Sequence, residues 1–180
     1  MRNRGCLSAG TIGIALLVIA AVLFFWGKNG YNSFTTKEET VNKKWSNVET
    51  VYQKRANLIP NLENTVKSYS QFEKETLTQV IEARSKATSI NIDPTNMTEA
   101  DMAKFQAAQG ELTGALSRLM AVVESYPNLK ADQQYLNFQR EYTAIENSIR
   151  SETVYFNDAA QDYNTTIKTF PNNILANFTN

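Results

Sequence analysis

The sequence predicts an all-α protein, in which an N-terminal transmembrane helix precedes a long antiparallel four-helix, coiled-coil-like bundle. Three observations predict this class. Residues 7–26 form one apolar stretch without a charged side chain. The remaining chain repeats apolar residues at intervals of three and four, which is the period of an amphipathic helix. The chain also has only four prolines and seven glycines, so long uninterrupted helices are favoured.

Residues 7–27 are the predicted membrane anchor, behind a short basic tail of residues 1–6. A helix of 20 residues rises about 30 Å, which is the thickness of the hydrocarbon core of a bilayer. Trp26 and Tyr31 would then lie where amphipathic aromatic rings gather at the membrane surface. A cleaved signal peptide is the main alternative, because Arg2 and Arg4 give a basic start. The apolar run is too long for one, however, and it lacks a small-residue cleavage site.

The charges flanking the anchor predict its orientation. Arg2 and Arg4 precede it, whereas Lys28 and the later lysines are partly offset by acidic residues. By the positive-inside rule we expect a single-pass inner (cytoplasmic) membrane protein with a cytoplasmic N-terminus and a periplasmic bundle. Cys6 is the one cysteine, so no intramolecular disulfide can form. We interpret it as a free thiol near the membrane, with palmitoylation as the alternative.

Composition argues against several kinds of function. The 18 acidic and 16 basic residues beyond residue 27 give a formal charge of −2, which is not the basic footprint of a nucleic-acid-binding domain. The chain has no histidine, the commonest general base and transition-metal ligand. Asp158 and Asp162 could contribute to an all-oxygen metal site, although carboxylates at this spacing more often face solvent. We therefore predict no enzyme activity, no cofactor or metal, and no small-molecule substrate.

The first two bundle helices are predicted at residues 31–58 and 61–89. The first has a heptad-like seam of apolar and aromatic residues. Pro60 disfavours helix at Ile59 and suits the first turn of a new helix, so we expect a corner there. The seam residues of the first helix are Phe34, Val41, Trp45, Val48 and Tyr52.

The other two helices are predicted at residues 99–125 and 131–169. Thr98 follows a loop at 90–98 and suits the N-cap of the third helix. Pro127 ends that helix, and Pro171 ends the fourth, which is the longest of the bundle. The bundle therefore covers residues 28–171. Residues 172–180 form a tail that is either amphipathic or disordered.

The predicted helix corners hold most of the candidate functional side chains. At the first corner, Asn57 and Asn61 would cap helix ends and Arg55 would be solvated or ion-paired, or these residues would form a polar recognition patch at the membrane-distal tip. On the fourth helix, a buried asparagine beside the seam can fix oligomeric state. The candidate interaction or structural residues are Arg55, Asn57, Pro60, Asn61, Tyr69, Tyr126, Pro127, Asn147, Asn157 and Tyr163.

Several blocks, in order between Tyr31 and Pro171, resemble the LemA family of bacterial membrane proteins. The most specific is KRANLIPNL at 54–62, followed by TVK at 65–67 and by Tyr69, which is similar to the family's RRxxLIPNL…TVKxY block. Further matches are EKETL at 73–77, YPNLKA at 126–131 and EYTAIENSI at 141–149. The resemblance implies a long antiparallel helical bundle on a membrane anchor and no defined enzyme activity.

The chain departs from the family pattern at three places. Phe72 lies where members often have a histidine, so no family function could depend on that imidazole. Ser148 replaces an arginine of the ENRI block, which removes any salt bridge from that position. The segment after Pro171 is short and lacks an aromatic-acidic ending.

The function predicted from these observations is a non-enzymatic, membrane-anchored helical scaffold of the bacterial envelope. It would act as a homo-oligomer or through other membrane or envelope proteins. The alternative is a membrane-remodelling or envelope-sensing module in which the tail and the 90–98 loop contact lipid.

Overall fold

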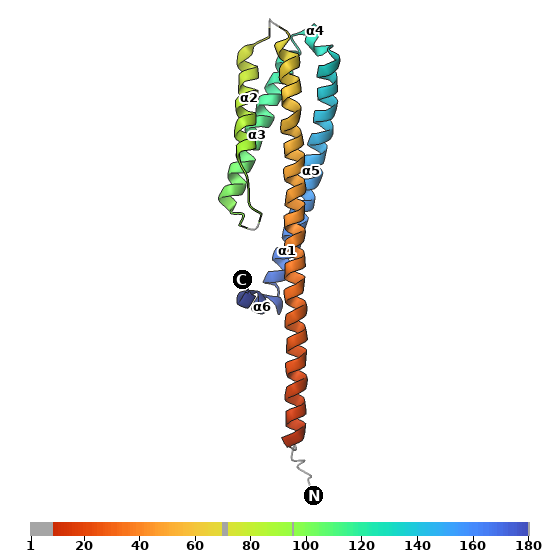
Figure 1. The fold of residues 1–180 in the computed structure, drawn as a ribbon, viewed down its shortest axis with the longest axis vertical. Helices are drawn as coiled ribbons and strands as arrows, with labels where there is room; N and C mark the ends of the chain where they lie inside the picture. Colours follow the sequence, from red (N-terminus) through yellow and green to blue (C-terminus); the bar gives the residue numbers. More distant parts are fainter. Residues whose placement is uncertain (1–8, 70–71, 95, 180) are drawn as a thin grey trace. The chain divides into compact units, whose positions relative to one another are not determined.

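The computed structural model describes residues 9–69, 72–94 and 96–179, and every regular element within these ranges is a helix (Figure 1). The predicted all-α class is therefore confirmed. Contacts group residues 42–157 into one compact unit and residues 1–41 with 158–180 into another. The helices are α1 (Ala9–Lys67), α2 (Lys74–Ser89), α3 (Glu99–Val123), α4 (Pro127–Lys130), α5 (Gln133–Lys168) and α6 (Asn172–Thr179).

The apolar stretch forms the first turns of α1. It is long and apolar enough to cross a membrane, and none of its most apolar 18-residue window is buried against protein. The large side chains from Ile12 to Phe25 are exposed. A core helix of a globular domain would bury such residues, so this exposure fits a helix surrounded by lipid. The predictions for Arg2, Arg4 and Cys6 lie outside the described residues.

The predicted corner at Pro60 is wrong, because α1 continues through Pro60 to Lys67. Proline has no N–H, so the carbonyl oxygen of Ala56, four residues earlier, loses its helical partner. Arg84 of α2 replaces it, because its Nε donates a hydrogen bond to that oxygen at 2.9 Å. Ile59 and Leu62 on either side of the proline are buried, which also favours continuation of the helix.

The unit of residues 42–157 is built around two apolar clusters. The larger contains Ile59, Leu62 and Val66 of α1 together with side chains from α2, α3, α4 and α5. The smaller surrounds Trp45 and Val48 of α1 with Ile92, Phe105 and Phe156. The helical stripes recognised in the sequence therefore do form the core.

The connections of this unit differ from the prediction at two places, the first corner and Pro127. The first corner follows Lys67 and precedes Lys74, with residues 70–71 outside the described part of the chain. The predicted N-cap of α3 is confirmed: Thr98 Oγ1 accepts a hydrogen bond from Asp101 N at 3.1 Å, and Asp101 in turn accepts from Thr98 N at 3.3 Å. Pro127 begins the short helix α4 rather than only ending α3.

The other unit contains the start of α1, the end of α5 and α6. Phe34 of α1 is buried, and Lys37 forms an ion pair with Asp162 of α5. The tail, for which the sequence predicts either an amphipathic or a disordered segment, forms α6. Leu175 of α6 packs so closely on Gly30 of α1 that a Cβ placed there would lie 2.5 Å from Leu175 Cδ2.

Candidate functional site

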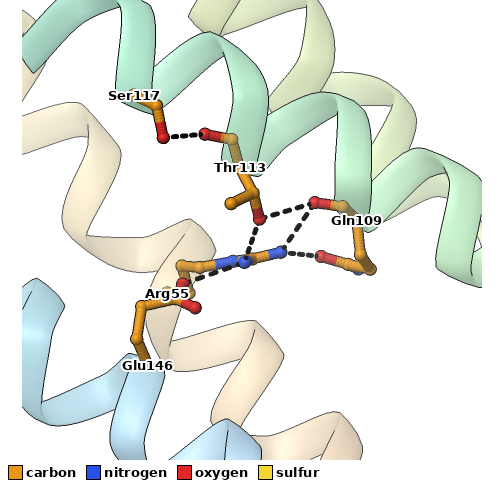
Figure 2. Close-up of polar contacts among 5 residues, drawn as sticks. All are labelled: Arg55, Gln109, Thr113, Ser117 and Glu146. Atoms are coloured by element: carbon orange, nitrogen blue, oxygen red, sulfur yellow. Dashed lines mark hydrogen bonds and ion pairs between the residues drawn. The ribbon is translucent and has the colours of Figure 1, made fainter. Parts of the chain in front are cut away.

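Arg55 is the centre of a polar cluster inside the unit of residues 42–157 (Figure 2). Its side chain is only 2% exposed. Nη1 donates to Thr113 Oγ1 at 2.8 Å and forms an ion pair with Glu146 Oε1 at 3.0 Å. Nη2 donates to the backbone oxygen of Gln109 at 3.2 Å and to its Oε1 at 2.5 Å. One guanidinium thus connects α1, α3 and α5.

The surroundings of Arg55 explain how a charge can be buried there. Tyr52, one turn earlier on α1, places its ring 4.9 Å from the guanidinium carbon, a cation–π contact. Thr113 and Ser117 continue the hydrogen-bonded chain along α3 through backbone carbonyls. Because Glu146 supplies a carboxylate and the other partners are neutral acceptors, the charge is both paired and hydrogen-bonded, as a buried cation requires.

Two tyrosines beside the cluster have raised pKa values. Burial raises the pKa of Tyr52 and raises that of Tyr142 to about 12. The carboxylate of Glu146 also raises both, because a tyrosinate beside it would be repelled, whereas the Arg55 guanidinium has the opposite effect. Both phenols therefore stay neutral at physiological pH. They serve as packing groups rather than as bases.

Tyr142 should make the protein sensitive to alkaline pH. The raised pKa means that the folded state prefers the neutral phenol more than the unfolded chain does. The resulting stabilisation is complete below about pH 10 and is lost as pH rises toward 12. We expect Tyr142→Phe to flatten the fall in thermal unfolding midpoint over this range. A variant with the same pH profile as the wild type would contradict this assignment, and Tyr155→Phe, at an exposed tyrosine, is the matched control.

A cleft of about 660 Å³ lies beside the cluster, between α1, α2, α3 and the segment after α2. Gln109 and Tyr52 line it and also contact Arg55, so they form the wall between the two. Glu49 lies in the cleft as well, and burial raises its pKa, with the neighbouring Trp45 acting in the opposite direction. The other lining residues are Ser46, Thr50, Gln53, Lys54, Ala56, Asn57, Ala87, Thr88, Ile90, Asn91 and Phe105.

The two asparagines of the predicted first corner are not helix caps. Asn57 and Asn61 both lie inside α1 because the helix passes Pro60, and both are exposed. Asn57 accepts a hydrogen bond from Gln53 at 3.1 Å, and the backbone oxygen of Asn61 accepts one from Thr65. Arg55 turns inward and is not part of an exposed patch with them. The ion-paired interpretation of Arg55 is the one that the structure supports.

The other corner residues come together. Tyr69 Oη donates to Asp132 Oδ2 at 3.0 Å and to the backbone oxygen of Asn128 at 3.3 Å, so the segments after α1 and after α3 lie side by side. The hydrogen bond to Asp132 raises the pKa of Tyr69. Tyr126 packs its ring 5.2 Å from that of Phe72. Pro127, the first residue of α4, is exposed.

The candidates on α5 are on its surface. Asn147 and Asn157 are exposed in the single chain, so neither is buried beside the core seam. Tyr163 is partly buried, and burial raises its pKa, as does the nearby Glu38. Asp162 pairs with Lys37, and no group of three Cys, Asp or Glu residues in the described ranges could hold a metal ion.

Three partners of Arg55 are not among the residues predicted to be functional: Gln109, Thr113 and Glu146. A signal for the buried arginine was present, because Arg55 lies three residues after Tyr52 and so continues the seam of α1. A side chain on a seam is expected to be buried, and a buried arginine needs an acid and neutral acceptors. The identity of those partners depends on how α3 and α5 pack, which no local pattern specifies.

Comparison with known proteins assigns the family. The model of the LemA family matches residues 44–180. Magnetosome protein MamQ 2 of Paramagnetospirillum magneticum is 28% identical over 163 residues, covering 81% of this chain and 60% of the relative. Magnetosome protein MamQ of Magnetospirillum gryphiswaldense is 27% identical over 166 residues, 83% of this chain and 61% of that protein. This chain thus spans about 60% of the length of these magnetosome relatives.

A further relative carries the family name itself. Protein LemA of Metamycoplasma hominis is 25% identical over 160 residues, covering 89% of this chain and 69% of that protein. The family model begins at Lys44 and includes the Arg55 cluster, the cleft and both corners. The helical fold, the sequence blocks and the family match agree, and the chain belongs to the LemA family.

Proposed function

We propose that this protein is a non-enzymatic, membrane-anchored helical scaffold of the bacterial envelope that acts by self-association, with other envelope proteins as further partners. The observation that carries the proposal is the outward face of α5 within the unit of residues 42–157. Leu136 and Val154 are 38% and 49% exposed on this face. They are 18 residues apart, about five helical turns, so they lie on one line along the helix.

Asn147 lies on the same line, 11 residues after Leu136 and seven before Val154, or about three and two turns. Arg140, Thr143 and Arg150 fill the intervening exposed positions. The result is a second heptad-like seam that points away from the core. Asparagine at such a position selects the number of helices that associate, and arginine is enriched in protein interfaces. Asn147 is thus a candidate determinant of oligomeric state between copies rather than of packing within one copy.

The interior supports the same proposal. The buried charge of Arg55 is used to join α1, α3 and α5, and the two neighbouring phenols are held neutral. These groups make the unit a rigid support for its surface. The magnetosome and LemA relatives are compatible with a scaffold at a membrane.

In this proposal the N-terminus is cytoplasmic and the bundle is periplasmic. Labelling of Cys6 with a membrane-impermeant thiol reagent tests this orientation.

The mass of the full-length protein in mild detergent tests self-association. We expect a discrete oligomer for the wild type and a smaller species for Leu136→Glu/Val154→Glu, because paired carboxylates would be desolvated at the contact. Ser148→Glu is the matched control. It adds a charge at an exposed position of α5 about 120° around the helix from the seam, and should leave the mass unchanged. A monomeric wild type, or an oligomer that the double variant does not alter, contradicts the proposal.

A further inference from the structure

Three large apolar side chains on and next to α6 are exposed. Phe170 is 79% exposed, Ile174 46% and Phe178 82%. They are spaced four residues apart, and Ile174 and Phe178 therefore share one face of α6. A patch of this kind is unfavourable in water and marks a surface that another apolar phase covers.

The position of α6 along α1 indicates which phase that is. Leu175 packs on Gly30, and Gly30 lies four residues, about 6 Å of helical rise, beyond Trp26 at the end of the apolar stretch. The headgroup layer on each side of a bilayer's hydrocarbon core is about 5–8 Å thick. If α1 spans the bilayer, its contact with α6 lies inside that layer. Figure 1 shows α6 lying across α1 rather than along it, which is the orientation of a helix in the membrane plane.

The composition of α6 suits this location. The helix NNILANFT contains no charged residue, so no ionised group needs to leave water when its apolar face enters lipid. Its polar side chains are asparagines and a threonine, and of these Asn177 and Thr179 are exposed and available to hydrogen-bond with headgroups or interfacial water. The Lys37–Asp162 ion pair binds α5 to α1 seven residues further from the membrane segment, about 10 Å beyond Gly30. This ion pair therefore lies on the side of α6 away from the apolar stretch.

We propose that α6 is an interfacial membrane helix, held at headgroup level by the contact of Leu175 with Gly30, with Phe170, Ile174 and Phe178 inserted among the lipid acyl chains. The occupant of the exposed apolar face is the lipid of the bilayer that α1 spans. A second attachment point beside the anchor restricts rotation and tilt of the protein at the membrane. This inference does not depend on self-association through α5.

Spin labelling of the full-length protein in phosphatidylethanolamine–phosphatidylglycerol vesicles tests it. With Cys6→Ser as background, one nitroxide is attached through Phe178→Cys and, in a second sample, through Asn164→Cys, an exposed position on α5. We expect the ratio of oxygen to nickel-chelate accessibility to be several-fold higher at position 178, because oxygen concentrates in lipid and the chelate stays in water. Equal ratios at the two positions would overturn the proposal.

Two comparisons identify the occupant and the contact that positions α6. Spin–spin broadening at position 178 that disappears on dilution with unlabelled protein would show that a second copy covers the face, and would also overturn the lipid assignment. Gly30→Leu should return the label at 178 to water, since the new side chain cannot share the space of Leu175. Gly27→Leu is the matched control, because no other group lies within 4 Å of a Cβ at that position.

Discussion

Replacing Trp45 with alanine is expected to lower the free energy of unfolding of the residue 42–157 unit by about 4 kcal/mol, within the range for truncating a buried aromatic side chain. The indole is 1% exposed and makes edge contacts with Phe105 and Phe156, at ring distances of 5.3 and 5.2 Å. Helices α3 and α5 cannot both move in to fill the resulting cavity, because each is also fixed by the larger apolar cluster.

The measurement is thermal unfolding of the full-length protein in mild detergent, followed by circular dichroism. Trp45→Phe keeps a ring in the cluster and should cost about half as much as the alanine variant. Tyr155→Ala is the control, because it removes a neighbouring aromatic ring that is 51% exposed, and should cost less than about 1 kcal/mol. If Trp45→Ala and Tyr155→Ala lowered the midpoint equally, the smaller cluster would not be a stabilising core.

Replacing Glu146 with leucine is expected to cost about 3 kcal/mol, because it leaves the Arg55 guanidinium, at a site that is 2% exposed, without both its counter-ion and the acceptor that Glu146 supplies. The Glu146 side chain is 31% exposed, so water can reach its place and partly solvate the Arg55 guanidinium once the carboxylate is removed. We therefore place the cost at the lower end of the range for buried ion pairs. Glu146→Gln keeps the hydrogen-bond acceptor and the shape while removing the charge. It should cost about 1 kcal/mol.

A double-mutant cycle separates the charge from the packing. Arg55→Met/Glu146→Leu removes both charges and keeps an apolar stem in the space of Arg55. It should be more stable than Glu146→Leu alone, since no unpaired ion remains. Thermal unfolding of the wild type, Arg55→Met, Glu146→Leu and the double variant under identical detergent conditions gives the coupling energy between Arg55 and Glu146. Additive losses would mean that Arg55 and Glu146 do not act as a pair.

Much of the fold follows from local sequence signals. The apolar stripe of each helix, the cap at Thr98 and an N-terminal helix long and apolar enough to cross a membrane are all encoded within a few helical turns, and the structure has each of them. The family blocks gave the architecture as a whole. Pro60, near the C-terminal end of α1, was the misleading signal, since its local preference to end a helix is overruled when Arg84 hydrogen-bonds to the Ala56 carbonyl, 28 residues earlier in the sequence.

The candidate site was less accessible to sequence analysis for the same reason. Arg55 lies beside the predicted corner at Pro60, yet its role depends on Gln109 and Glu146, which lie 54 and 91 residues away along the chain. Asn147 lies beside the apolar seam in the sequence, and only the packed structure shows that it points outward. Spacing along one helix identifies a face, but the identity of what covers that face depends on tertiary structure.

The contact between Arg84 and the Ala56 carbonyl also acts as a check on how the α1–α2 hairpin closes. A proline inside a helix leaves one backbone oxygen that only an outside donor can satisfy, and in this chain that donor is a single guanidinium. If α2 were shifted along α1 by one helical turn, apolar side chains would still face each other, but the Ala56 oxygen would be left without a hydrogen-bond donor. Apolar packing alone would allow several alignments of α2 along α1. Pro60 favours the alignment in which Arg84 reaches the Ala56 oxygen, although the same proline weakens the isolated helix.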